Sequence, residues 1–465
     1  MAVPAGTARS IVIVGAGFSG ALTAVNLLRL APPGGLRVVL VNKSGRMARG
    51  IAYGTRSAEH VLNVPAGNMS ALADDPEDFV RFCRWSDPSI EPASFVSRRL
   101  YGTYLEALLA AAEHGGGEQA QLDREVGEVV SIKFDSAARR ARVVLDDGRS
   151  INADHVVLAF GHFPPADPPV STPSFYASDR YVRDPWARAA LHGIEPDEPV
   201  LLLGSGLTAV DVALALRCNG QRAPIVCVSR RGLMPQSHRV SRGLHAVIDV
   251  QPLLQAMGHS TRSYLRAVRR HVHDRVEVGD DWRDVLAQLR AHTPVLWQRL
   301  PAHERARFLR HVQPYWDVLR HRCAPAPFAR YSELVAAGAV RVVAGRILAY
   351  EEDSQGIVVT LRRRGNRHTE QLRVSRVVNC TGPDSDLRRS RTPLVRELLA
   401  HHLIQPDPFG LGISVDENYA ALDAAGCAST MLHYIGPLLK ARDWEATAVP
   451  ELRESARRLA QRLLG

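Results

Sequence analysis

The chain has 465 residues, of which 46% are hydrophobic and 23% are charged, as expected for a folded globular protein of two or three domains. Its net charge of +10 comes from arginines spread along the chain, not from a basic stripe interleaved with aromatics, which argues against nucleic-acid binding. No apolar run reaches the roughly 18 to 20 residues that span a bilayer, and the N-terminus does not resemble a signal peptide, so we expect a cytoplasmic protein with no membrane partner.

The first predicted unit begins with "IVIVGAGFSGALTAVNLL" from Ile11, a strand, a glycine-rich turn and a helix. The first glycine of such a turn allows the tight bend, the second lets a pyrophosphate approach, and the third packs the helix on the strand. The alternative is a turn that packs the helix and binds nothing. The residues that we expect to contact a dinucleotide are Gly15, Gly17, Phe18, Ser19 and Gly20.

The strand "LRVVLVN" follows and ends at Asn42, where such folds usually carry an acidic residue that binds the ribose. An amide can still hydrogen-bond a ribose hydroxyl, but without the assistance of charge. Alternating strands from Arg124 to His162 then predict a β-meander and a closing strand at Val156–Phe160. The closing strand is followed by Gly161, where the backbone can approach a ligand.

The same plan recurs in "LLLGSGLTAVDVALAL" from Leu201, followed by a second meander and a closing strand at Arg376–Cys380. The predicted dinucleotide contacts here are Gly204, Ser205, Gly206, Thr208 and Gly382. The strand Ile225–Val228 leads into Ser229, Arg230 and Arg231, where the adenosine ribose would lie. Arginines at this place can pair with a 2′-phosphate and predict NADPH in preference to NADH, whereas the alternative is a surface arginine pair.

A helical segment, residues 237–328, interrupts the second unit. Its basic residues His238, Arg239, His321 and Arg322 could bind an acidic group of a substrate, and the alternative is salt bridges at a domain interface or solvated faces. We expect Trp297, Phe308 and Trp316 to belong to the core. "RRRGNRH" (362–368) predicts an exposed hairpin tip.

We therefore predict an α/β fold with two Rossmann-like dinucleotide-binding domains, each with a β-meander, and a helical insert. The first domain comprises residues 1–165 and 375–465, the second, for NADPH, residues 195–236 and 329–374, and the insert residues 237–328. The six cysteines form no CxxC or CxxxxC motif, and His401 and His402 have no suitable partners, so we expect reduced, buried thiols and no metal.

With these turns, "AFG", "CTG" and "SRRG" in place, the chain resembles flavoproteins with two dinucleotide-binding domains, including flavin-containing and N-hydroxylating monooxygenases. More narrowly it resembles a bacterial FAD/NAD(P)-binding family marked by "RGIAYGT…HVLNVPAGNMSAL", "SRRGLMPQSHR", "WDVLRHR" and "WEATAVPELR". The chain departs from the residues usual in this family at two positions, where Asn42 replaces an acidic residue and Phe160 replaces a Thr.

The resemblance implies FAD in the first domain and NAD(P)H in the second, and it implies that Asn63 and Met69 line the isoalloxazine ring. A loop capped by Asn side chains is the alternative. The N-terminus of the last helix, at Thr447 and Ala448, could face the flavin N1–C2 edge, or Thr447 could be an ordinary N-cap.

The function that we expect is an FAD-dependent, NADPH-using monooxygenase. It would use O₂ to oxygenate a small nucleophilic substrate, such as an amine or amino-acid nitrogen, through a flavin C4a-peroxide, with no side chain identified as catalytic. The alternatives are a flavin dehydrogenase or reductase that transfers no oxygen, and a non-catalytic FAD-binding redox sensor.

Overall fold

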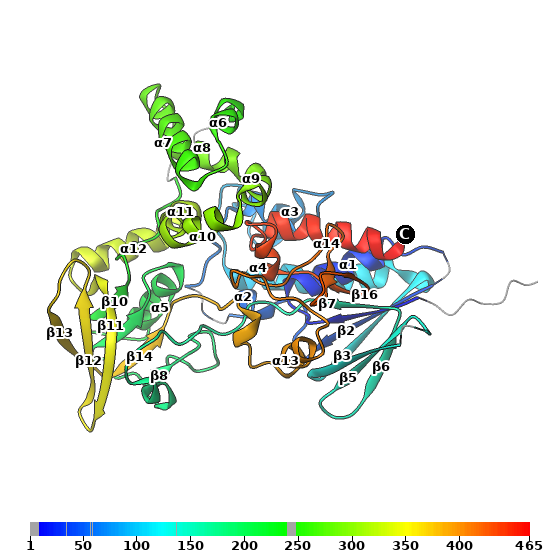
Figure 1. Cartoon of the computed structure of the whole chain (residues 1–465), viewed down its shortest axis with the longest axis horizontal. Helices are drawn as coiled ribbons and strands as arrows, with labels where there is room; N and C mark the ends of the chain where they lie inside the picture. The colour runs from blue at the N-terminus through cyan, green and yellow to red at the C-terminus, as the bar shows by residue number, and fades with distance from the viewer. Residues whose placement is uncertain (1–8, 34, 56, 58, 136, 240–247) are drawn as a thin grey trace, which may run out of the picture.

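The computed structural model describes residues 9–465 except 34, 56, 58, 136 and 240–247. Two β-sheets with parallel centres, each containing a strand that leads through a glycine-rich turn into a helix, form the body of the molecule (Figure 1). A group of helices stands above both sheets in this view. The predicted α/β fold class with two Rossmann-like units is confirmed.

The first sheet has the strand order β15-β16-β7-β1-β2-β3. Its strands are β1 (Arg9–Val14), β2 (Leu36–Asn42), β3 (Ala120–Val126), β7 (His155–Leu158), β15 (Ala420–Leu422) and β16 (Ala428–Tyr434). All neighbours pair in parallel except β15, which is antiparallel to β16. Because the C-terminal strand β16 pairs with β7, the end of the chain completes the first unit.

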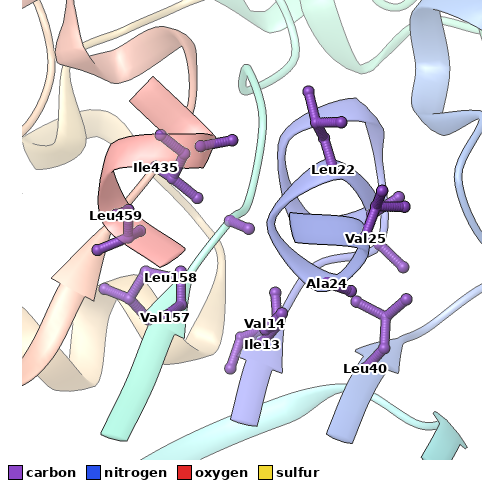
Figure 2. Close-up of a cluster of buried hydrophobic side chains, with 14 of the residues drawn as sticks. Ile13, Val14, Leu22, Ala24, Val25, Leu40, Val157, Leu158, Ile435 and Leu459 are labelled. Atoms are coloured by element: carbon purple, nitrogen blue, oxygen red, sulfur yellow. The ribbon is translucent and has the colours of Figure 1, made fainter. Parts of the chain in front are cut away.

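Helices α1 (Phe18–Arg29), α4 (Arg98–Gly115) and α14 (Val449–Leu464) pack beside one another on this sheet. Figure 2 shows α1 above the strands, with Ala24 facing them, beside the helix α14, whose Leu459 lies above Val157 and Leu158. The central strands β1, β2 and β7 are mostly apolar and buried, since a parallel sheet covered on its faces buries both sides of its central strands, whereas the edge strand β3 carries exposed and half-buried polar residues. A separate antiparallel sheet of β4 (Val129–Asp135), β5 (Arg140–Leu145) and β6 (Ser150–Ala153) adds to the same core.

The second sheet has the order β13-β12-β11-β10-β9-β14-β8. Its strands are β8 (Tyr181–Val182), β9 (Val200–Leu203), β10 (Ile225–Ser229), β11 (Val340–Asp353), β12 (Gly356–Arg363), β13 (Thr369–Val374) and β14 (Arg376–Asn379). The long strand β11 pairs in parallel with β10 and antiparallel with β12, so the second meander continues the sheet, whereas the first forms its own. The segment 364–368 is the exposed hairpin tip that we expected.

The insert lies between β10 and β11. Its helices are α6 (Gln251–Ala256), α7 (Thr261–Glu277), α8 (Trp282–Leu289), α9 (Thr293–Arg299), α10 (Ala302–His311), α11 (Gln313–Arg320) and α12 (Pro325–Ala336), the last of which packs on α5 (Leu207–Cys218). The remaining helices are α2 (Gly50–Tyr53), α3 (Asp78–Ser86) and α13 (Pro393–Ala400). Trp297 is buried against Phe308 and Trp444, and Trp316 is packed against the same cluster, as expected of core residues. The limits that we gave for the three regions stay predictions.

No helix in the described part of the chain is long and apolar enough to cross a membrane. The described residues also contain no group of three His, Cys, Asp or Glu side chains able to hold a metal ion. All six cysteines are unpaired, but only four are buried. The expectation of buried thiols is wrong for Cys218 and Cys427, which lie at the surface at the end of α5 and beyond the end of β15.

Candidate functional site

The first glycine turn joins β1 to α1 and is held by the neighbouring strands. Gly15 has a φ of +108°, and its N–H donates to Val41 O at 2.9 Å. A Cβ at this position would lie 2.7 Å from Ala159 O, so the turn needs glycine for its conformation and for space. Ala159 in turn donates its N–H to Val14 O at 2.8 Å, which fixes the closing strand beside the turn.

The helix that follows begins at an open position. Gly17 is the N-cap residue, no side chain caps the helix, and no acidic residue lies in its first turn. A Cβ at Gly17 would meet only the Cα of Gly50, at 3.5 Å, whereas one at Gly20 would lie 1.8 Å from Gly15 O. The free N–H groups and the adjacent space therefore suit an anionic phosphate, and Gly20 serves close packing.

The second turn repeats this geometry. Gly204 has a φ of +112°, donates its N–H to Val228 O at 2.8 Å, and has room for no Cβ because Cys380 O would lie 2.5 Å away. A Cβ at Gly206 would have nothing within 4 Å, and no side chain caps α5. Buried Ala209 takes the place of the third glycine. The two turns thus offer the same kind of phosphate site.

The glycines after the two closing strands are also open. A Cβ on Gly161 or Gly382 would meet nothing within 4 Å. Cys380 donates its N–H to Leu203 O at 2.8 Å, as Ala159 does to Val14 O. Each turn therefore has, at its side, a backbone segment that a ligand can approach.

Comparison with known protein families agrees with this geometry. Residues 12–163 match the model of an FAD-NAD(P)-binding family. This part of the chain is an FAD-NAD(P)-binding domain. A search of curated protein sequences finds no significant match to the chain.

Solved structures share the fold over nearly the whole chain. The ornithine N-hydroxylase of Kutzneria sp. 744, in complex with reduced FAD, NADP⁺ and L-ornithine, is 15% identical with a TM-score of 0.62, covering 98% of this chain and 99% of its own. L-lysine 6-monooxygenase from Pseudomonas syringae is 16% identical with a TM-score of 0.64 and the same coverage. The FAD-bound cadaverine monooxygenase of Erwinia amylovora is 14% identical with a TM-score of 0.63, covering 98% and 95%. The chain therefore has the two-dinucleotide-binding flavoprotein fold.

Within the FAD-NAD(P)-binding domain, Asn42 is engaged by its own loop. Its Nδ2 donates to Arg46 O at 2.6 Å and to Ser44 Oγ at 3.0 Å. No described residue donates to its Oδ1, so only the amide oxygen is available to a ribose hydroxyl. The ribose contact stays a prediction. Phe18 packs its ring near Tyr53 and Tyr101, so only its backbone faces the predicted phosphate site.

The two arginines after β10 differ in their surroundings. Arg230 is exposed and makes no hydrogen bond or ion pair with a described residue. Arg231 donates to Arg310 O at 2.9 Å and lies over the ring of Tyr315. Ser205 Oγ lies 2.7 Å from Ser229 Oγ and 2.6 Å from Leu233 O, which ties the second turn to the loop that carries both arginines.

The predicted flavin loop lies between α2 and α3, and two contacts hold it. Asn63 accepts a hydrogen bond from His238 Nε2 at 2.9 Å through its carbonyl oxygen, and Met69 is buried. Arg453 of α14 donates to Ser70 O at 3.0 Å, which joins the loop to the last helix. The isoalloxazine contacts of Asn63 and Met69 stay predictions.

The last helix begins without a side-chain cap. Ala448 is the N-cap residue, so the alternative that Thr447 is an ordinary N-cap is wrong. The N–H groups of Thr447 and Ala448 bond to Glu445 O at 2.7 and 3.2 Å in a tight turn before the helix. The first-turn N–H groups of α14 that have no partner within the helix remain free for an anionic group.

The basic residues of the insert are engaged by protein groups. Arg239 donates to Asp281 Oδ2 at 2.8 Å and also pairs with Asp284. Arg322 is 9% exposed, donates to Leu319 O and lies over Trp282. These contacts favour salt bridges and packing inside the insert, and a substrate role of His238, Arg239, His321 and Arg322 stays a prediction.

Where the insert meets the C-terminal segment, the fold brings together a set of side chains that no sequence pattern indicated. Asp317 and Arg320 of α11 lie near Lys440 and Glu445, and His162 follows Gly161 after the first closing strand. The motifs "WDVLRHR" and "WEATAVPELR" contain most of these residues. The two motifs are therefore visible in the sequence, but their juxtaposition is not.

Proposed function

We propose that this protein is an FAD-dependent, NADPH-using monooxygenase that oxygenates a nitrogen atom of a small amine or amino acid. The observation that carries the proposal is the repetition of one phosphate-binding geometry in two sheets, at Gly15–Gly17 and Gly204–Gly206. Two such turns suit two dinucleotides, and transfer of a hydride from one to the other is the simplest use of both. The fold shared with ornithine, lysine and cadaverine monooxygenases supports the oxygenation step.

The first unit would hold FAD. The N-terminus of α1 would bind the pyrophosphate, and the N-terminus of α14 would face the N1–C2 edge of the flavin. When bound, FAD would accept a hydride from NADPH and activate O₂. The ring of Phe160 lies 5.4 Å from that of Tyr434, whose hydroxyl donates to Phe160 O, so these contacts hold the segment before Gly161 in place.

The second unit would hold NADPH. The N-terminus of α5 would bind its pyrophosphate, and the exposed guanidinium of Arg230 would bind the 2′-phosphate. Such a site works by positioning the cofactors and substrate, so it needs no nucleophilic side chain.

One experiment separates the monooxygenase from a flavin reductase and from a redox sensor. Purified protein should carry a flavin absorbance spectrum, and NADPH should bleach it in the absence of air. Re-admission of O₂ with amines and amino acids should then give hydroxylated product in proportion to NADPH consumed. Bleaching with hydrogen peroxide as the only oxygen product would favour the reductase, and flavin that NADPH does not bleach would favour the redox sensor.

A further inference from the structure

The insert contacts the C-terminal segment through polar groups. Arg290 pairs with Glu451 in the first turn of α14, and Arg320 Nη2 lies 3.1 Å from Glu445 Oε2. Trp297 donates its Nε1–H to Ala441 O at 3.0 Å. In Figure 1, α10 and α11 lie next to the segment that leads into α14. These contacts place α11 beside the segment that leads into the last helix, and Arg290 beside its first turn.

A group of charged side chains lies in this contact, and three of them contain buried atoms without a hydrogen-bond partner. We call it the Lys440 cluster, and its members are His162, Asp317, Arg320, His321, Lys440 and Glu445. Glu445 is 2% exposed, yet neither of its carboxylate oxygens accepts a hydrogen bond from a described residue, and its pair with Arg320 is an ion pair without hydrogen-bond geometry. Asp317 Oδ1 and Arg320 Nε are also buried without a hydrogen bond, and His321 Nε2 lies 3.8 Å from Asp317 Oδ1. Buried polar atoms are unfavourable in this state unless a ligand or water pairs with them.

The cation at the centre of the cluster also lacks an anionic partner. Lys440 Nζ lies 4.4 Å from the centroid of the Trp444 ring and makes no ion pair with a described residue. Trp444 directly precedes Glu445, the partner of Arg320, so Lys440 lies close to this ion pair. Burial raises the pKa of Asp317 and of Glu445, whereas the charge of Lys440 lowers these two pKa values and that of His162.

The two histidines of the cluster contribute no charge near neutral pH. Desolvation, the largest effect, and nearby cations together lower the pKa of His162 to about 4 and that of His321 to about 3. The cluster therefore offers three carboxylate oxygens that accept no hydrogen bond from a described residue, together with the donors of Lys440 and Arg320. Three acceptor atoms match the three N–H donors of an ammonium group, and the two cations match a carboxylate.

We propose that the Lys440 cluster is the substrate subsite and that it binds a zwitterionic amino acid. Asp317 and Glu445 accept hydrogen bonds from the substrate ammonium, and Lys440 and Arg320 bind its carboxylate. The cluster adjoins Gly161 and Thr447, the two segments assigned to the flavin, so an amino acid held there would lie beside the ring. This assignment rests on the proposed function, and it distinguishes an amino acid from a simple amine such as cadaverine.

Binding to the oxidised FAD-loaded enzyme without NADPH tests the proposal separately from oxygenation. Calorimetry would use the twenty common L-amino acids and L-ornithine, followed by the decarboxylated and deaminated analogues of the tightest ligand. We expect one amino acid or a small group to bind, and each analogue to bind at least about ten-fold more weakly, since each lacks a charge-assisted hydrogen bond. Absence of binding by every amino acid, or equal affinity for the decarboxylated amine, would overturn the proposal.

Two variants assign the ends of the ligand. Glu445→Gln should remove the preference for the ligand over its deaminated analogue, and Lys440→Met should remove the preference over its decarboxylated analogue. The control is Glu451→Gln, which alters the neighbouring ion pair outside the cluster and should keep both preferences. If Glu445 had a purely structural role, Glu445→Gln would instead weaken the binding of the ligand and of both analogues equally. A failure of oxygenation with these binding preferences intact would count against the proposed function, not against the subsite.

Discussion

Arg98 and Asp211 form a buried ion pair between the two nucleotide-binding units. Arg98 Nη2 donates to Asp211 Oδ2 at 2.8 Å, and their side chains are 14% and 11% exposed. Arg98 begins α4 of the first unit and Asp211 lies in α5 of the second. Arg98 also donates its Nε–H to Val61 O at 3.0 Å, so one guanidinium joins three segments.

This pair should fix the two units relative to one another. Arg98→Met leaves the carboxylate of Asp211 buried without its partner, and we expect a loss of about 3 to 5 kcal/mol in the free energy of unfolding. The double variant Arg98→Met with Asp211→Leu should be less destabilised than Arg98→Met alone, because no buried charge remains. Urea unfolding of the parent, the two single variants and the double variant measures this, and equal losses in Arg98→Met and the double variant would contradict it.

The open position at Gly17 predicts a variant that folds but loses its flavin. The Cβ of Gly17→Val has only Gly50 nearby, so the fold should persist, while the side chain fills the predicted phosphate site. We expect normal circular dichroism and no flavin after purification. Gly20→Val, whose Cβ would lie 1.8 Å from Gly15 O, should instead fail to fold. Full flavin content in folded Gly17→Val would refute the assignment of the first turn.

The exposed position of Arg230 leads us to predict that the protein prefers NADPH to NADH as its reductant. A charge-assisted hydrogen bond to the 2′-phosphate contributes about 1.5 to 3 kcal/mol, so kcat/KM for flavin reduction should favour NADPH over NADH by at least about ten-fold. Arg230→Ala with Arg231→Ala should remove most of this preference, mainly through KM, since the phosphate is remote from the hydride.

The single variants sharpen this test. Arg230→Ala should have the larger effect, because Arg231 is already bonded to Arg310 O and packed on Tyr315. Stopped-flow reduction with both nucleotides provides the measurement. Equal rates with NADPH and NADH in the parent enzyme would assign the two arginines to another role.

The ion pairs of Arg239 predict an effect on stability and not on substrate affinity. Arg239→Ala removes its contacts with Asp281 and Asp284, and we expect a lower melting temperature with little change in the substrate KM. Differential scanning calorimetry and steady-state kinetics on the same preparation separate the two effects. A raised KM at unchanged stability would restore the substrate role that the sequence suggested.

The buried side chain of His433 leads us to predict that the folded protein loses stability at acidic pH. It is buried, neither ring nitrogen has a described partner, and burial lowers its pKa to about 4. Because the folded pKa lies below the ordinary value, its contribution is fully present above about pH 6.5 and is lost as the pH falls toward 4. Between pH 7 and pH 5, protonation of His433 in the unfolded state lowers the free energy of unfolding by about 2 kcal/mol. His433→Phe should flatten that part of the profile in urea unfolding, and an unchanged profile would show that other groups cause it.

The sequence by itself determined the two glycine turns with the strands and helices that flank them, the closing strands, the helical character of the insert, and the fold class. These features depend on local physics: the backbone at Gly15 and Gly204 needs a positive φ, and a few neighbouring residues decide whether a helix or a strand follows. The sequence also indicated that the C-terminal segment completes the first unit, but not that β16 pairs with β7.

Only the tertiary structure decided which side chains meet. Arg239 faces Asp281, Arg98 faces Asp211 from the other unit, and Glu445 faces Arg320 from the insert, across separations of 42, 113 and 125 positions. No local pattern records such contacts, because they arise when apolar faces of separate elements are buried together and bring along the charges at their ends. The roles of charged residues follow from that long-range packing, whereas the dinucleotide turns follow from the residues within them.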